Sequence, residues 1–180
     1  NGSAAGIISN AFSSDDVDPG FFNLQITTPP AVALMTADQA FTIASWWYIN
    51  DTGQAIAFAR IDAVDPASPG FAYQWQLGIV STIPRFLIGS GAALQVVSVA
   101  AGITTGAWHF IVAWHDPSAN TISIQADLGT IASAAWADGT INANKAMCIG
   151  NNKFNDGVTN AWDGRIDATG VWYRVLTAAE

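Results

Sequence analysis

Large apolar residues recur along this chain with the period of β-strands. The clearest run is FAYQWQLGIV at residues 71–80, in which every second residue from Phe71 onward is large and apolar. Such alternation buries one face of a strand and leaves the other face to polar or small residues. Residues 41–49 (FTIASWWYI) are apolar at both parities, which is typical of a central strand covered on both sides. No segment of useful length shows a helical period, so the pattern predicts β-structure.

Similar runs separated by turn residues predict strands at residues 55–61, 85–88, 93–99, 107–114, 121–127, 146–149 and 165–175. Nine or ten short strands at this spacing indicate an all-β fold, an antiparallel two-sheet β-sandwich. Because Trp46, Trp47 and Tyr48 are consecutive, at least one must point away from the core. We expect the core to contain Trp75 and the row of one parity in residues 107–114, namely Trp108, Phe110, Val112 and Trp114.

The organisation along the chain predicts one domain. Residues 1–20 are small and polar, so we expect an N-terminal tail or connector there and the β-sandwich domain over residues 21–180. Residues 177–180 (TAAE) match a helix capping box, in which Thr177 and Glu180 satisfy the first backbone donors of a helix. A capping box at this position suggests that the parent chain continues.

The distribution of acidic residues argues against catalysis. Of 14 Asp and Glu residues only Glu180 is a glutamate, whereas β-sandwich glucanases act with a pair of Glu side chains. We therefore expect no enzymatic activity. The net charge of −8 disfavours nucleic acid and anionic membranes as partners. No apolar stretch is long enough for membrane insertion.

Three segments together resemble one family. They are FTIASW at residues 41–46, GAWHFIVAWHD at 106–116, and the closing WDGRID at 162–167 with VWYRVLTAAE at 171–180. Their order and spacing resemble laminin-G-like (pentraxin-like) domains of the concanavalin A-like lectin/glucanase superfamily. The resemblance implies a jelly roll that binds carbohydrate or protein, often with calcium, on secreted proteins, cell surfaces and phage particles. Ala168 departs from the acidic residue usual after Ile-Asp, and Leu128 interrupts the usual Asp-Gly.

Candidate ligand-binding residues fall into two groups. Residues 142–163 are rich in Asn and Asp, and amides bind sugar hydroxyls while aromatic rings serve as platforms. The first group therefore contains amide and aromatic residues in loops: Asn151, Asn152, Phe154, Asn155, Trp162 and also Trp136. The second group, Arg60, Gln74 and Gln76, is expected on the exposed concave face of one sheet. Ordinary turn formation and a solvated sheet face explain the two groups equally well.

A calcium site is a further expectation, and the resemblance supplies it. Related jelly rolls tie the closing strand to the N-terminal segment with calcium, which would use Asp167 with Asp16 and Asp18 here. The alternative is that Asp167 pairs with an arginine or caps a turn. His109 and His115 lie about 20 Å apart along an extended strand, so they cannot share a metal.

The sequence thus predicts a non-enzymatic recognition or adhesion module. We expect a glycan or surface polysaccharide as ligand, and an extracellular, cell-surface or virion location. The alternative is a structural virion protein, such as a capsid decoration, fibre or tail component, that contacts other chains of a larger assembly through the same fold.

Overall fold

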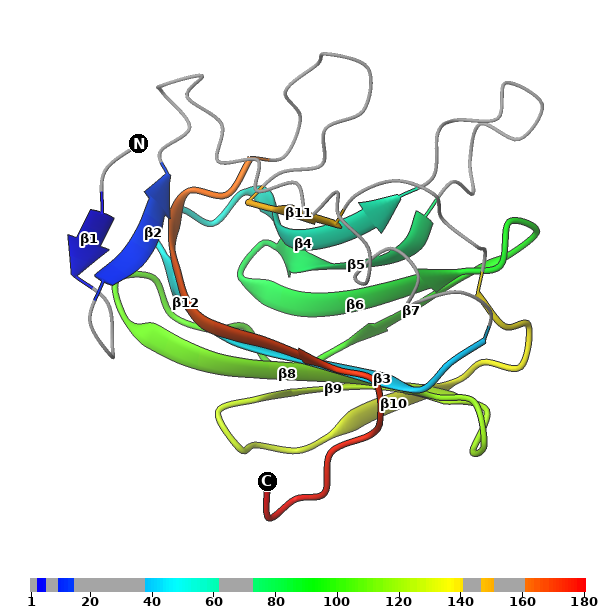
Figure 1. Cartoon of the computed structure of the whole chain (residues 1–180). Helices are drawn as coiled ribbons and strands as arrows, with labels where there is room; N and C mark the ends of the chain where they lie inside the picture. Colours follow the sequence, from blue (N-terminus) through cyan, green and yellow to red (C-terminus); the bar gives the residue numbers. More distant parts are fainter. Residues whose placement is uncertain (1–2, 6–9, 15–37, 62–72, 141–146, 151–160) are drawn as a thin grey trace.

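A computed structural model describes residues 3–5, 10–14, 38–61, 73–140, 147–150 and 161–180 as two antiparallel sheets packed face to face (Figure 1). This confirms the predicted all-β two-sheet sandwich. The seven-stranded sheet has the order β1 (Ser3–Ala5), β2 (Asn10–Ser14), β12 (Gly164–Trp172), β3 (Phe41–Ile49), β8 (Trp108–Asp116), β9 (Thr121–Ala126) and β10 (Ala132–Ala135). The five-stranded sheet has the order β11 (Met147–Ile149), β4 (Gln54–Ile61), β5 (Tyr73–Val80), β6 (Ile83–Gly89) and β7 (Leu94–Ser98).

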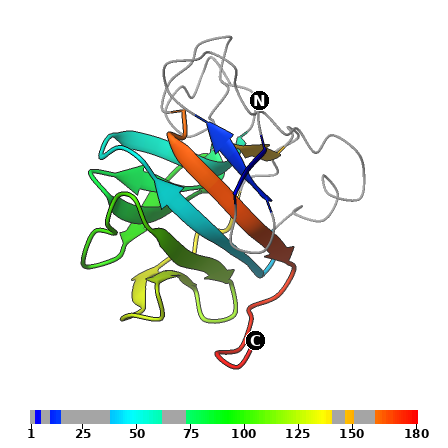
Figure 2. The same ribbon diagram turned by 90° about the vertical axis from the view of Figure 1, so that its left-hand side faces the viewer.

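Two strands lie within the segment expected to be a tail. Figure 2 shows β2 beside β12, and the register pairs Ser13 with Arg165 and Phe12 with Ile166. β1 pairs with β2 in turn. The expectation of a tail is therefore wrong for these strands. Their sequences, SAA and NAFSS, carry no sustained apolar alternation, so the pattern along the chain did not predict them as strands. The domain boundary at residue 20 stays a prediction.

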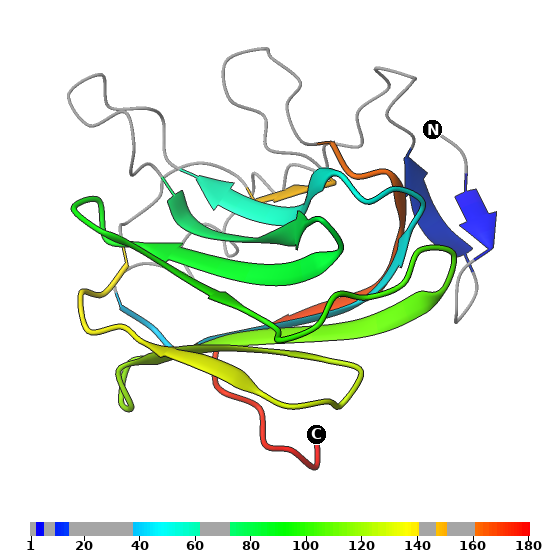
Figure 3. The same cartoon turned by 180° about the vertical axis from the view of Figure 1, so that it is seen from behind.

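The core lies between the sheets and combines large rings with aliphatic side chains. Figure 3 shows the five-stranded sheet stacked on the seven-stranded one. Trp47 of β3, Trp75 of β5 and Phe86 of β6 are fully buried between them. Trp75, Leu77 and Ile79 share the inner face of β5, as the alternation predicted. Ile122 and Ile124 of β9 point inward as well.

The parity of β8 is the reverse of the expected one. Ile111 and Ala113 are fully buried in the core, whereas the row Trp108, Phe110, Val112 and Trp114 is half-buried on the outer surface. The expectation that this row is core is wrong. The inner parity of β8 packs Ile111 and Ala113 against the large rings of β3, β5 and β6, with the His115 ring beside Phe41 at one end.

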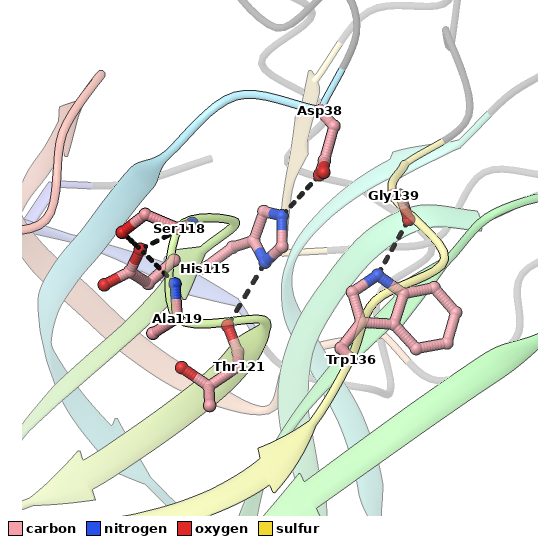
Figure 4. Close-up of polar contacts among 8 residues, drawn as sticks. Asp38, His115, Ser118, Ala119, Thr121, Trp136 and Gly139 are labelled. Atoms are coloured by element: carbon pink, nitrogen blue, oxygen red, sulfur yellow. Dashed lines mark hydrogen bonds and ion pairs between the residues drawn. The ribbon is translucent and has the colours of Figure 1, made fainter.

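Both histidines tie β8 to neighbouring segments. His115 Nε2 lies 2.6 Å from Asp38 Oδ1, and its Nδ1 lies 3.2 Å from the carbonyl of Thr121 (Figure 4). At the other end of β8, His109 Nδ1 lies 2.6 Å from Asp127 Oδ2 and its Nε2 lies 3.0 Å from the carbonyl of Thr104. Each ring therefore has a carboxylate and a backbone carbonyl of its own. These contacts fix both ends of the strand.

The turn after β8 is closed by an aspartate. Asp116 Oδ1 accepts hydrogen bonds from the Ser118 hydroxyl at 2.6 Å and from the Ser118 and Ala119 amides at 2.9 and 3.2 Å. These donors, the hydroxyl above all, hold the pKa of Asp116 below its usual value. The turn then leads directly into β9.

The end of the chain forms a compact turn beneath the seven-stranded sheet. Glu180 accepts a hydrogen bond from the Thr177 amide at 3.1 Å, which is the Glu half of the predicted capping box. Its carboxylate also binds both terminal nitrogens of Arg174.

The described part of the chain contains no helix long and apolar enough to cross a membrane.

Candidate functional site

The two tryptophans expected to serve as platforms are buried. β10 pairs with β9 as far as Ala135. Directly after it, the Trp136 amide donates to the carbonyl of Asn120 at 2.7 Å. The Trp136 indole enters the core and donates to the carbonyl of Gly139 at 2.7 Å (Figure 4). Trp162 packs edge-on against Trp47, with ring centroids 5.0 Å apart. Neither ring presents a face to solvent, so the expectation of exposed rings is wrong.

The expected sheet-face residues are also less exposed than predicted. Arg60 pairs with Trp75 in the register, so it shares the inner face of the five-stranded sheet and is only 2% exposed. Gln74 is 1% exposed, and Gln76 is half-buried. An open polar face formed by these three residues is therefore not present. The bulges between β4 and β5 change which residues face outward.

Several expected site residues lie outside the described residues, and their roles stay predictions. They are Asn151, Asn152, Phe154 and Asn155 of the ligand group and Asp16 and Asp18 of the calcium group. Asp167 lies on β12, and its Oδ1 accepts a hydrogen bond from the Ala168 amide at 2.7 Å. Among the described residues no three His, Cys, Asp or Glu side chains are grouped to hold a metal ion.

The structure instead brings a different set of rings together on the outside. We call this surface the aromatic face. It is the outer surface of the seven-stranded sheet, formed by Trp46 and Tyr48 of β3, Trp108, Phe110 and Trp114 of β8, and Trp172 of β12. Because Trp47 and Ile49 of β3 point into the core, the even-numbered residues of that strand point outward.

Cross-strand pairs organise the aromatic face. Tyr48 lies opposite Trp108 with ring centroids 5.6 Å apart, and Trp46 lies opposite Phe110 at 5.4 Å. The first pair is edge-to-face and the second is tilted, which are the favourable orientations for neighbouring rings. All four rings are half-buried. The face therefore offers aromatic surface that is already held in place.

Trp172 reaches this face because of a bulge. Residues 165 and 167 pair with Tyr48 and Trp46, whereas Gly170 and Trp172 pair with Ala44 and Thr42 one register step later. Ala168, inside the bulge, has a φ of 47°. The extra residue exchanges the two faces of the strand beyond it. Without it, Trp172 would point into the core.

Gly170 determines how the Trp172 indole lies. A Cβ on Gly170 would sit 2.2 Å from Cη2 and 2.7 Å from Cζ2 and Cζ3 of Trp172. The six-membered ring therefore lies over the backbone of Gly170, while 37% of the residue stays exposed. The end of the chain crosses the sheet nearby, since the Thr42 hydroxyl donates to the carbonyl of Arg174 at 2.8 Å and accepts from the Leu176 amide at 3.1 Å.

An arginine, Arg165, lies among these rings. Arg165 of β12 holds its guanidinium carbon 4.7 Å from the centroid of the Tyr48 ring. Arg165 lies opposite Tyr48 in the register, and Tyr48 lies opposite Trp108, so the three side chains form one row across the sheet. Cation–π stacking of this kind favours arginine, whose guanidinium is planar and weakly hydrated.

Known proteins resemble this chain in sequence family and in fold. Residues 23–180 match the family model described as the concanavalin A-like lectin/glucanases superfamily. The chain belongs to this superfamily. The sequence has no match among curated proteins. The predicted laminin-G-like and pentraxin-like resemblance is confirmed, because solved relatives in fold include a laminin domain pair and a pentraxin.

Three solved structures illustrate which superfamily members resemble this chain. The carbohydrate-binding module CBM40 of a Ruminococcus gnavus IT-sialidase, bound to α2,3 sialyllactose, is 12% identical with a TM-score of 0.75, over 94% of this chain and 92% of that one. Domain 4 of the extracellular arabinanase AbnA from Geobacillus stearothermophilus, in complex with arabinotriose, is 16% identical with a TM-score of 0.69, over 98% and 77%. Domains LG4-5 of mouse laminin α1 are 15% identical with a TM-score of 0.59, over 74% and 35%. At these identities the likeness shows the fold.

Proposed function

We propose that this superfamily member is a non-catalytic glycan-recognition module and that its ligand lies on the aromatic face. The observation that carries the proposal is Trp172, whose indole is laid over Gly170 and left exposed. Apolar faces of sugar rings stack on such an indole, and nearby polar groups orient the hydroxyls. Carbohydrate-binding modules among the structural relatives support the same chemistry.

The test is a glycan array followed by titration with the best ligands. The wild-type chain should bind at least one glycan class. Trp172→Ala should weaken that binding by about tenfold, equivalent to about 1.4 kcal/mol, with an unchanged melting temperature. Binding that survives both Trp172→Ala and Trp46→Ala would contradict the aromatic face as the site. If the chain binds no glycan on the array, glycan recognition itself is contradicted.

The absence of catalysis is part of the proposal. Glu180 lies at the end of the chain and binds Arg174, so it is not available as half of a catalytic carboxyl pair. Incubation with the bound glycan should therefore release no reducing sugar. Sustained release that one Asp→Asn change abolishes would contradict this part of the proposal.

Calcium binding through Asp167 also stays a proposal. The described residues do not supply a cluster of three ligating side chains, so such a site depends on Asp16 and Asp18. Binding to the native state alone raises stability by mass action. The melting temperature should then rise in calcium, fall in chelator, and lose this response in Asp167→Ala.

The second candidate function is to form contacts with other chains of a larger assembly. We propose an extracellular, cell-surface or virion location for both this role and glycan recognition. Two apolar side chains at the β9–β10 connection favour assembly contacts, since Leu128 is 81% exposed and Ile131 is 50% exposed. Exposed apolar groups of this kind occur at protein–protein contacts. A structural role predicts concentration-dependent association that Leu128→Asp removes. A strictly monomeric chain with glycan affinity would favour recognition.

A further inference from the structure

Arg165 is held by an aromatic ring. The ion pairs His109–Asp127, His115–Asp38 and Arg174–Glu180 do not include it. Its guanidinium lies against the Tyr48 ring instead. Stacking leaves the edge of the guanidinium, with its N–H donors, available to a ligand.

The location of Arg165 matters as much as its stacking on Tyr48 in place of a carboxylate partner. The chain has only 6 Lys and Arg residues and a net charge of −8. Arg165 lies on the aromatic face, in the same row as Tyr48 and Trp108. Asp167, two residues further along β12, has Oδ1 on the Ala168 amide. A positive group is therefore held beside stacking rings on an otherwise acidic protein.

A ligand suited to this arrangement carries an anionic group beside an apolar ring face. Carboxylates bind guanidinium groups through two parallel hydrogen bonds, which are stronger than hydrogen bonds between neutral groups. Arg165 and Trp172 are seven residues apart on β12, roughly 20 Å for an extended strand. The aromatic face is therefore long enough for several sugar rings, with the carboxylate at the Arg165 end.

We infer that the glycan recognised by this face is acidic and that Arg165 binds its carboxylate in a bidentate manner. This inference rests on the proposed glycan-recognition function and specifies its ligand class. The carboxylate can belong to a uronic acid within a polymer or to a terminal sialic acid. Both present the same planar anion to the guanidinium, so the binding chemistry is shared and the experiment separates the sources.

The experiment compares each acid with its methyl ester, which keeps the sugar ring and removes the charge. The full chain is titrated with galacturonate oligomers, sialyllactose and the methyl ester of each, using calorimetry at low and high salt. At least one acid should bind about tenfold more tightly than its ester at low salt. High salt should reduce that difference. The acid that shows it identifies the source.

Substitutions then assign the difference to one side chain. Arg165→Gln should equalise the affinities for acid and ester. Arg165→Lys should keep only part of the difference, because an ammonium group cannot bind a carboxylate in a bidentate manner. Arg85→Gln is the matched control, since Arg85 lies opposite Gly78 on the outer face of the other sheet. It makes the same change in net charge and should keep the full difference.

The outcomes separate this inference from the proposed function. Equal affinity for acid and ester in the wild-type chain overturns the acidic-ligand inference, and so does a difference that survives Arg165→Gln. Glycan recognition on the aromatic face still stands in both cases if Trp172→Ala weakens binding. A chain that binds no glycan, neutral or acidic, overturns both.

Discussion

The two outer faces of this sandwich contrast more than their sequences suggest. On the seven-stranded sheet, rings such as Trp46, Tyr48 and Trp108 remain half-buried and reach solvent. On the five-stranded sheet, the outward-facing Ile56 and Ala59 are fully buried. Farther along the same outer face of the five-stranded sheet, Val96 is 42% exposed, so that face is covered at β4 and open at β7. Apolar character alone does not tell which row of a strand is covered, because coverage depends on what packs above it.

The largest expected effect separates two neighbouring tryptophans. Trp47→Ala should lower the free energy of unfolding by about 3–5 kcal/mol, because it leaves a cavity in the core. Trp46→Ala, on the aromatic face, should cost about 1 kcal/mol and lose the tilted contact with Phe110. Urea denaturation followed by circular dichroism measures both. Equal losses of unfolding free energy in the two variants would show that Trp46 is packed as deeply as Trp47, and would contradict an outward-facing aromatic face.

A second pair of substitutions compares glycines on the two outer faces. A Cβ on Gly78 would lie 2.4 Å from the carbonyl oxygen of Ala55, which is backbone and cannot move aside. Gly78→Ala should therefore cost about 3 kcal/mol. Gly170→Ala meets only the Trp172 ring, which can swing out, so it should cost about 1 kcal/mol or less.

The two glycine variants should also differ in ligand binding. Gly170→Ala should weaken glycan binding by about tenfold, close to the loss from Trp172→Ala, because the added Cβ displaces the indole that Trp172→Ala removes. Correctly folded Gly78→Ala protein should bind normally. Thermal melts and titrations on the same samples provide both measurements, and unaltered binding by Gly170→Ala would show that the indole orientation is irrelevant.

A third comparison concerns the tight turns of the two sheets. Asp127 and Leu128 both have positive φ, 49° and 57°, and the Gly129 amide donates to the carbonyl of Ala126 at 2.8 Å. Leucine is strained in such a turn and glycine is not. Leu128→Gly should therefore raise the free energy of unfolding by about 1 kcal/mol.

The matched turn lies between β5 and β6, where Ser81 and Thr82 also have positive φ. Thr82 contacts Gly102, since a Cβ there would meet its Oγ1 at 2.3 Å, and its carbonyl accepts from the Ile103 amide at 2.9 Å. Thr82→Gly would lose the side-chain contact, so its net gain should be smaller. A larger gain at Thr82 than at Leu128 would contradict this account of the strain.

The smallest effect is expected at the end of the aromatic face. Hydrogen bonds from Arg174 and Thr177 lower the pKa of Glu180 from 4.5 to about 2. Because the pKa is lowered, the contact stabilises the fold fully at pH values above the ordinary pKa of 4.5. This stabilisation is lost as the pH falls through about 2. The Thr177 amide resonance should shift across that window with little change in global stability. Glu180→Gln should show no such titration.

The sequence predicted the fold well because alternation and turn residues report on each strand separately. Trp75, Leu77 and Ile79 were correctly placed in the core. The order of three motifs identified the superfamily. The candidate site was harder, because it depends on contacts between strands. The inner parity of β8 contains two histidines and the outer one is aromatic, so its sequence favoured the wrong row for the core and could not show that Trp108 and Trp114 face outward.

The β12 bulge shows the same limit in another way. One added residue, with Ala168 at positive φ, moves Trp172 from the inner face to the outer one. Only cross-strand register reveals this shift. A departure at Ala168 from the family pattern was visible in the sequence, and it marked the right place without indicating its consequence. β1 and β2 were missed because their residues carry no alternation.

The contact between Trp47 and Trp162 gives this protein an optical signal of its own. The two indoles lie 5.0 Å apart at 69°, close enough for their electronic transitions to couple. Trp47 belongs to β3, while Trp162 comes two residues before β12. Coupling of this kind produces paired bands of opposite sign in circular dichroism. These bands should vanish when β3 and β12 separate, which allows unfolding of the seven-stranded sheet to be followed without a label.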